Sequence, residues 1–314
     1  MKRRFFAIAA INLFLAVTAF GQTYILDIKR ESARSDKITG GIVKTTLAGG
    51  EGQLKITINI PAFQLTLWQN GKEVKSYPIG VGLLEYPLVI GQKQASSIEW
   101  NPVWIPPSSD WIEKSSTVKP GEIVLPTDPR NPLGKVKIPL GYGYLIHQAK
   151  GPGDLGSLVS HGCVRVIKAD LYDLAEKIIE ARGLNVSSKQ IANAKLTKKT
   201  LILPLDPFLP VEITYDTMVV EDGRLHIYPD VYAHKRNTIE NLRQELTSSG
   251  IDVSGLTDGT LKKMIAAATG KRQFVVSTAD LEAGNALVTG RAVSVINSPG
   301  SAPKRSVRKQ KRDR

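Results

Sequence analysis

The chain has 314 residues, of which 42% are hydrophobic, and a formal net charge of +13. This apolar fraction supports one large or two modest domains with a buried core, and no segment after residue 21 is apolar enough to span a membrane. The charge is concentrated at the ends: residues 2–4 contribute +3, and residues 304–314 hold seven Lys/Arg and one Asp, a net of +6. Subtracting 3 and 6 from 13 leaves +4, so the middle of the chain is close to neutral.

The first 21 residues have the pattern of a secretory signal peptide. A positively charged start precedes an apolar run over residues 5–20, which is shorter than the about 20 apolar residues that a bilayer crossing needs. Ala19 and Gly21 are the small residues expected three and one positions before a cleavage site, which we place directly after Gly21. We therefore expect an exported protein, in the periplasm or cell wall, with an N-terminal extension over residues 22–53. A retained anchor is the alternative.

Strands are predicted where the folded part begins. Residues 54–60 alternate apolar and polar side chains, which is typical of a half-buried strand. A second apolar run at 63–68 leads through Asn70-Gly71 to a third at 74–81. Asn-Gly between two such runs predicts a tight hairpin, because both turn positions need positive φ.

The middle of the chain is rich in proline. Prolines crowd residues 87–139, so we expect short strands and structured loops there rather than long helices. A further apolar run, residues 143–146, ends at His147. A glycine-rich loop over residues 150–156 separates this run from the string at 160–166.

Helices are predicted after this string. Apolar residues recur there on one helical stripe, and Asp170 and Gly183 can cap the helix that they predict. The stripe consists of Leu171, Leu174, Ala175, Ile178 and Ile179. Further strands are expected at 201–205, 211–215, 274–276 and 286–295, a hairpin around 221–224, and helices at 238–249 and 258–269.

The residues able to carry out chemistry gather between positions 147 and 163. Cys163 is the only cysteine, so it cannot form an internal disulfide, and a thiol needs a base or a cation to become a nucleophilic thiolate. His147, at the end of one strand, and Cys163, at the start of another, can meet on adjacent strands. Gly162 allows a sharp turn that points consecutive backbone amides at one spot, as an oxyanion hole requires.

Three neighbouring side chains extend this group. Ser160 can hydrogen-bond a histidine or a substrate amide. Arg165 can hold a carboxylate substrate or lower the thiol pKa, although a structural ion pair is an equal alternative. His161 is either catalytic or orients Ser160 or the thiol.

These residues resemble the signature of the L,D-transpeptidases with a YkuD-type catalytic domain, in particular the exported, ErfK/YbiS-like members. The signature consists of Ile146-His147, a loop, and Ser160-His161-Gly162-Cys163-Val164-Arg165. Residues 59–63, 77–82, 99–104 and 131–134 are also typical of the group. Two features depart from it: Gln148 stands where many members have Gly, and residues 86–91 read Tyr-Pro-Leu-Val-Ile-Gly where many have Tyr-Pro-Thr-Pro-Thr-Gly. The departures put the shape of the loop and the acceptor preference in doubt.

The resemblance implies a mainly β fold with helices, a YkuD-type β-sandwich with a short helix after the motif. It covers residues 54–182. We expect a β extension at 195–235, a C-terminal α+β extension at 236–298 whose role the sequence does not indicate, and a basic disordered tail at 299–314.

The resemblance also implies a reaction. Cys163 would attack the carbonyl of the L-centre residue that precedes a D-residue in a tetrapeptide stem of peptidoglycan. His147 would act as base and then acid, and backbone amides around 161–163 would hold the oxyanion. D-Ala would leave, and a second stem would attack the thioester to form a 3→3 cross-link; attack by water would make the enzyme an L,D-carboxypeptidase. No metal or organic cofactor is implied, and carbapenems are expected to acylate the thiol.

Other interpretations stay open. Cys163 could be a buried structural thiol, or His147, His161 and Cys163 could bind zinc. The same fold could also serve as a non-catalytic wall-binding protein. We expect a monomer that contacts anionic wall or membrane through its tail and binds no nucleic acid. His226 and His234 are interpreted as surface residues, Trp68 as core, and Trp100, Trp104 and Trp111 as either core or glycan-binding.

Overall fold

The computed structural model describes residues 53–297. The predicted signal peptide, nearly all of the N-terminal extension and the basic tail lie outside the described residues. Within the described part, no helix is both long and apolar enough to cross a bilayer.

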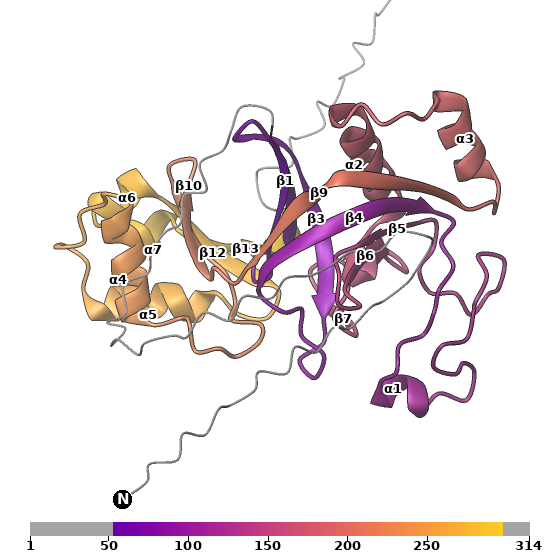
Figure 1. Ribbon diagram of the computed structural model, residues 1–314. Coiled ribbons are helices and arrows are strands. Elements are labelled where there is room, and N and C mark those ends of the chain that lie inside the picture. The colour runs from indigo at the N-terminus through magenta and orange to yellow at the C-terminus, as the bar shows by residue number, and fades with distance from the viewer. Residues whose placement is uncertain (1–52, 298–314) are drawn as a thin grey trace, which may run out of the picture. The chain divides into compact units, whose positions relative to one another are not determined.

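Nine strands form one sheet in the order β2-β1-β9-β4-β5-β6-β8-β3-β7 (Figure 1). Because β2 also pairs with β3, the first eight strands of this order close into a barrel-like ring, and β7 pairs with β3 outside it. The strands are β1 (Leu54–Asn59), β2 (Gln64–Gln69), β3 (Lys72–Gly82), β4 (Gly91–Trp100), β5 (Val136–Pro139), β6 (Leu145–Gln148), β7 (Leu158–Ser160), β8 (Val164–Val166) and β9 (Leu201–Thr214). The mainly β class expected from the sequence is confirmed, and the strands of the ring share one apolar core.

The predicted first hairpin is present. Side chains of β1 alternate between buried and half-buried, with Ile56 and Ile58 fully enclosed. Asn70 and Gly71 have φ of 55° and 76° and join β2 to β3, with Gln69 opposite Lys72. Local sequence therefore determines where the sheet begins.

One strand is longer than predicted. The sequence suggests separate strands at 201–205 and 211–215, but β9 continues through both, parallel to β1 and antiparallel to β4. Prolines within β9 interrupt its apolar pattern. The pairing of β9 with β4 continues past them with a register shift between Ala95 and Ser97 of β4. A segment about 140 residues along the chain from β1 thus completes the main sheet.

Two helices follow the motif at residues 160–166. All five stripe residues of α2 (Lys168–Ala181) are buried, as predicted, and Gly183 takes φ of 56° just after the helix ends. The prediction that Asp170 caps α2 is wrong, because the N-cap is Ile167 and Asp170 lies in the first turn. The second helix, α3 (Ser188–Leu196), was not predicted, although Ser187 and Gln190 form a capping box at its start.

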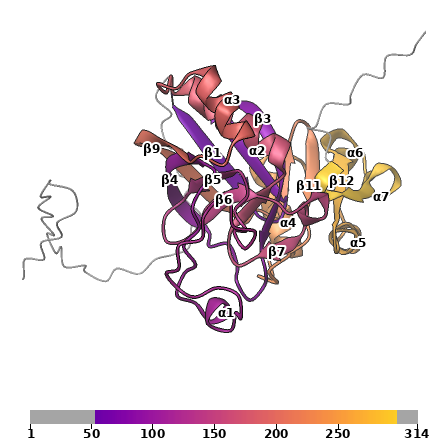
Figure 2. The ribbon, with the colours of Figure 1, turned by 90° about the vertical axis from the view of Figure 1, so that its right-hand side faces the viewer.

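The proline-rich loop between β4 and β5 has a small core of its own. It holds α1 (Asp110–Glu113) and an isolated bridge between Trp104 and Val124, and α1 lies far from α2 and α3 in both views (Figure 2). Its apolar residues are Trp104, Ile112, Val118, Val124 and Leu133. Of the other tryptophans, Trp100 is fully buried. The core prediction for Trp68 is wrong: it is half-buried, and its Nε1 donates to Thr57 Oγ1 at 2.8 Å.

A second sheet, in the order β10-β11-β12-β13, forms a separate core with the helices around it. Its elements are β10 (Met218–Glu221), β11 (Arg224–Ile227), α4 (Ile239–Ser248), α5 (Asp258–Ala267), β12 (Arg272–Ser277), α6 (Thr278–Glu282), α7 (Ala286–Thr289), β13 (Arg291–Ser294) and the 3₁₀ turn Val295–Asn297. The hairpin at 221–224 and both predicted helices are confirmed. The strand predicted at 286–295 is wrong in its first half, which forms α7. His226, predicted to be exposed, is buried, with its Nδ1 2.9 Å from Gln273 Oε1.

Candidate active site

Two parallel neighbouring strands, β6 and β8, bring the predicted catalytic residues to one region. Their register pairs Ile146 with Val164 and His147 with Arg165, so Cys163, one residue before β8, comes opposite Leu145. Side chains two residues apart on a strand point to the same face. The imidazole, the guanidinium and the thiol therefore share one face of the sheet.

His147 is buried and neutral. Its side chain is only 4% exposed, and within residues 53–297 its Nδ1 has no hydrogen-bond partner. Burial and then the Arg165 guanidinium lower the pKa of His147 to about 3, against opposing contributions from the Gln148 carbonyl and the Asp154 carboxylate. At neutral pH this imidazole is uncharged and able to accept a proton.

Cys163 is a half-buried thiol. Burial raises its pKa above the ordinary value for cysteine, while the Leu145 amide and the Arg165 guanidinium favour the thiolate and oppose that rise. The free protein therefore holds a neutral thiol near a neutral imidazole rather than a preformed ion pair.

The turn before Cys163 is fixed by the backbone. Ser160 is buried, and its Oγ donates to the Cys163 carbonyl at 2.6 Å, so this hydroxyl supports the turn. Gly162 has φ of 100°, and a Cβ at this position would lie 3.1 Å from Tyr144 Cε1. The positive φ favours glycine here, and the Tyr144 ring leaves little room for a Cβ. Among residues 53–297, the amides of Gly162 and Cys163 donate no loop or side-chain hydrogen bond.

Arg165 has a half-buried ion-pair partner that sequence reasoning missed. Its Nη1 lies 3.2 Å from Asp154 Oδ2, and both side chains are at most 15% exposed. Asp154 sits in a 3₁₀ turn, Pro152–Asp154, within the glycine-rich loop, where its Oδ2 also accepts the Lys150 amide. The structural ion pair considered for Arg165 is thus present, and it holds the cation beside His147 and Cys163.

His161 belongs to an aromatic group. Its ring stacks on that of Trp111 of α1 at a centroid distance of 4.1 Å. The Trp111 ring also stacks on that of Trp104, at a centroid distance of 6.5 Å. The Tyr86 ring meets His161 edge-on at 4.7 Å, and the Tyr86 hydroxyl bonds Asp110. Burial and Arg165 lower the pKa of His161. Its contacts link the proline-rich loop to the turn that carries the thiol.

Tyr232, about 70 residues after Cys163 in the sequence, supports the same region. Its hydroxyl donates to the Gly82 carbonyl at 2.9 Å and accepts from the Leu88 amide at 3.1 Å. Gly82 in turn packs so closely on the Gly162 backbone that a Cβ there would lie 3.0 Å from the Gly162 Cα. No local sequence signal identifies this contact.

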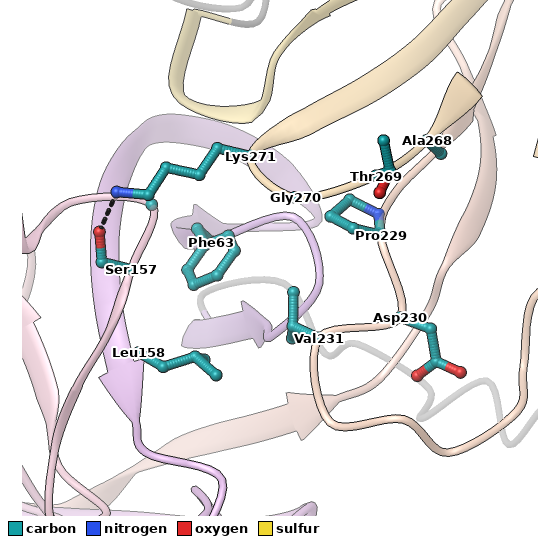
Figure 3. Close-up of a pocket in the computed structure, with 11 residues that line it drawn as sticks. Phe63, Ser157, Leu158, Pro229, Asp230, Val231, Ala268, Thr269, Gly270 and Lys271 are labelled. Carbon is teal, nitrogen blue, oxygen red and sulfur yellow. Dashed lines mark hydrogen bonds between the residues drawn. The ribbon is translucent and has the colours of Figure 1, made fainter. Parts of the chain in front are cut away.

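No group of three or more His, Cys, Asp or Glu side chains in the described part of the chain could hold a metal ion. A pocket of about 520 Å³ lies elsewhere, lined by residues such as Phe63, Leu158 and Val231 (Figure 3). Lys271 at its edge points to Ser157 and donates to the Ser157 hydroxyl. Neither Cys163 nor His147 lines this pocket, so it is separate from the site described above.

The structure is thus a mainly β domain with a thiol, an imidazole and a guanidinium on neighbouring strands. Residues 53–196 match the YkuD family model, described as the L,D-transpeptidase catalytic domain. The resemblance of the motif to the YkuD-type L,D-transpeptidases is thus confirmed for these residues.

Individual relatives are similar over a limited part. The chain is 31% identical over 130 residues to the probable L,D-transpeptidase YbiS of Escherichia coli strain K12, covering 39% of this chain and 41% of that protein. It is 27% identical over 130 residues to the probable L,D-transpeptidase ErfK/SrfK of Salmonella typhimurium, covering 39% and 40%. The matches thus span about two fifths of these relatives' length. Among solved structures, an L,D-transpeptidase from Mycobacterium smegmatis aligns at 17% identity and a TM-score of 0.34, over 52% of this chain and 58% of that one.

Proposed function

We propose that this protein is a peptidoglycan L,D-transpeptidase that uses Cys163 as its nucleophile and His147 as its base. The observation that carries the proposal is the shared face of β6 and β8. There the chain's single thiol accompanies a buried imidazole whose Nδ1 has no hydrogen-bond partner among the described residues. A reactive pair of this kind has no use in a protein that only binds the wall. The substrate would be the tetrapeptide stem, as for the family that the motif resembles.

The charges of the free site favour a proton transfer that accompanies attack. Both groups are neutral at pH 7, so the thiol proton moves to the His147 imidazole as sulfur attacks the carbonyl of the L-centre residue. The resulting imidazolium is stabilised by the Gln148 and Leu133 carbonyls and by the Asp154 carboxylate, all of which raise the pKa of His147. The Arg165 cation opposes this step and favours the thiolate instead.

The tetrahedral oxyanion would be held by backbone amides. Those of Gly162 and Cys163 are without loop partners in the described chain, and the positive φ of Gly162 sets the turn that presents them. Each such donor contributes about 2.7–4 kcal/mol to lowering a barrier of this kind. Collapse of the intermediate breaks the amide bond, His147 returns its proton to the amine of D-Ala, and the acyl group stays on sulfur as a thioester.

The second half of the reaction determines the product. An amine of another stem attacks the thioester, His147 accepts its proton, and the thiol is released with a 3→3 cross-link formed. Attack by water gives a tripeptide instead, which is L,D-carboxypeptidase activity. In this scheme Ser160 and Gly162 shape the turn, Arg165 tunes the thiol, and His161 acts through the aromatic group beside it.

The test is incubation of the purified, signal-free protein with tetrapeptide muropeptides, followed by mass spectrometry. We expect D-Ala loss together with dimers for the wild type and neither for Cys163→Ala. Tripeptides without dimers would identify the carboxypeptidase. Binding to sacculi without any loss of D-Ala would indicate a non-catalytic wall-binding protein and would contradict the proposal.

A further inference from the structure

The hairpin between β5 and β6 holds an exposed tyrosine in a strained backbone. Gly141, Tyr142 and Gly143 have φ of 82°, 52° and 80°, and Tyr142 is 93% exposed. A left-handed conformation at a non-glycine residue costs about 1–3 kcal/mol and is often kept at ligand-binding sites. Because the Tyr142 ring is exposed, burial of the ring does not offset this conformational cost. The hairpin tip therefore contributes little to folding and is suited to contact with a ligand.

Lys93 of β4 reaches this tyrosine and the next one. Its Nζ lies 5.5 Å from the Tyr142 ring centroid and 5.4 Å from that of Tyr144, within the range of cation–π attraction. Two other lysines on tyrosine rings have carboxylate partners: Lys75 pairs with Asp173 at 2.9 Å, and Lys195 pairs with Glu176. Within residues 53–297, no carboxylate lies at ion-pair distance from Lys93. In this part of the chain, the ammonium group of Lys93 therefore has no counter-ion.

Tyr144 connects the ammonium group to the nucleophile. Its ring is half-buried and packs on Gly162, where a Cβ would lie 3.1 Å from Tyr144 Cε1. Burial, followed by the charge of a Cys163 thiolate, raises the pKa of the Tyr144 phenol, which agrees with its place near the sulfur. One aromatic ring thus separates Lys93 from the turn that carries the thiol.

We propose that Lys93, Tyr142 and Tyr144 form a subsite that binds a carboxylate of the stem peptide. The inference rests on the proposed function and adds a recognition element to it. An extended peptide advances about 3.3–3.6 Å per residue. A stem whose scissile carbonyl lies at the thiol can therefore place a carboxylate, one or two residues away, across the Tyr144 ring and beside Lys93. The ammonium supplies the charge and the two phenols supply donors.

The experiment measures steady-state turnover of three synthetic tetrapeptide stems. One has all carboxylates free, one has the C-terminal carboxylate amidated, and one has its internal carboxylates amidated. The variants are Lys93→Met, Lys93→Arg and, as a matched control, Lys168→Met, which removes another lysine that lies on a tyrosine ring, that of Tyr172. Direct binding to the Cys163→Ala protein, with and without Lys93→Met, gives a readout that needs no turnover.

We expect Lys93→Met to raise KM and to weaken binding about tenfold on the free stem with kcat unchanged, as loss of one charge-assisted contact predicts. Lys93→Arg and Lys168→Met should behave as the wild type. Amidating the contacted carboxylate should weaken wild-type binding to the same degree, with no further loss in Lys93→Met. The amidated stem that shows this behaviour identifies which carboxylate is bound.

An equal loss on all three stems, a change in kcat alone, or no difference between Lys93→Met and Lys168→Met would overturn the subsite. These outcomes are distinct from failure of the proposed function, which would appear as absence of wild-type turnover on every stem.

Discussion

At the scale of single residues, the site is determined by which charges are buried. His147 and Arg165 lie side by side in the β6–β8 register, and a cation next to an enclosed imidazole keeps that imidazole neutral. Asp154 serves as the counter-ion of the guanidinium. Burial raises the pKa of Cys163, which favours the neutral thiol at neutral pH.

This protonation state predicts how the thiol reacts with iodoacetamide. Because the pKa of Cys163 is raised, the alkylation rate should increase about tenfold per pH unit from pH 7 to 9 without a plateau. Cys163 is the only cysteine, so total alkylation by mass spectrometry reports on it alone. His147→Gln should follow a similar profile. A plateau near neutral pH that disappears in His147→Gln would show a preformed thiolate–imidazolium pair and contradict the charge assignment.

Sequence identified the candidate reacting residues more readily than the residues that support them. Cys163, His147 and Gly162 stand in a short motif whose chemistry can be derived from residue type. Asp154 lies in a loop with no pattern of its own, and Lys93 and Tyr232 reach the site only through strand pairing and packing over long sequence distances. Such contacts depend on tertiary structure, which local patterns do not encode.

At the scale of elements, local sequence patterns again predicted the short-range features and missed the long-range ones. The Asn70-Gly71 hairpin and the buried stripe of α2 follow from turn chemistry and helical periodicity, and both are present. The course of β9 between β1 and β4 was not predicted, because its prolines break the apolar pattern and its partners are distant in sequence. The first half of the segment 286–295 formed α7 for a related reason: short apolar runs fit a helix or a strand equally well.

A substitution at Tyr232 tests whether the segment after β9 supports the site. Tyr232→Phe removes the hydroxyl that bridges Gly82 and Leu88, leaving two buried backbone groups without partners. We expect the free energy of unfolding to fall by about 1–3 kcal/mol, with faster hydrogen exchange at the Leu88 amide and slower turnover.

The matched control is Tyr172→Phe. The Tyr172 hydroxyl is buried and has no hydrogen-bond partner in the described chain, so its removal should leave stability and turnover nearly unchanged. If Tyr232→Phe and Tyr172→Phe are equally stable and equally active, the bridge has no supporting role.

At the scale of the whole molecule, the catalytic-type domain carries extensions at both ends. Residues 53–196 match the YkuD family model, and the second sheet with α4–α7 has its own core. The basic residues at 304–314 lie outside the described part, but their net charge of +6 suits attraction to anionic wall polymers or lipid headgroups.

Removing residues 299–314 tests that attraction. Turnover of soluble muropeptides should be unchanged, because the reacting groups lie elsewhere, while retention on isolated sacculi should weaken and the difference should shrink at high salt. A pull-down with full-length and shortened protein measures both. Equal retention of the two proteins would exclude a role for the tail in wall binding.

The proposed acyl transfer is tested most directly by locating the covalent intermediate. Wild-type protein is mixed with a tetrapeptide stem, quenched in acid and digested, and the peptide containing Cys163 is weighed. We predict a tripeptide acyl group on that sulfur, formed with one equivalent of D-Ala and missing in His147→Gln over the same time. Release of D-Ala without label on Cys163, or continued release by Cys163→Ala, would contradict the mechanism.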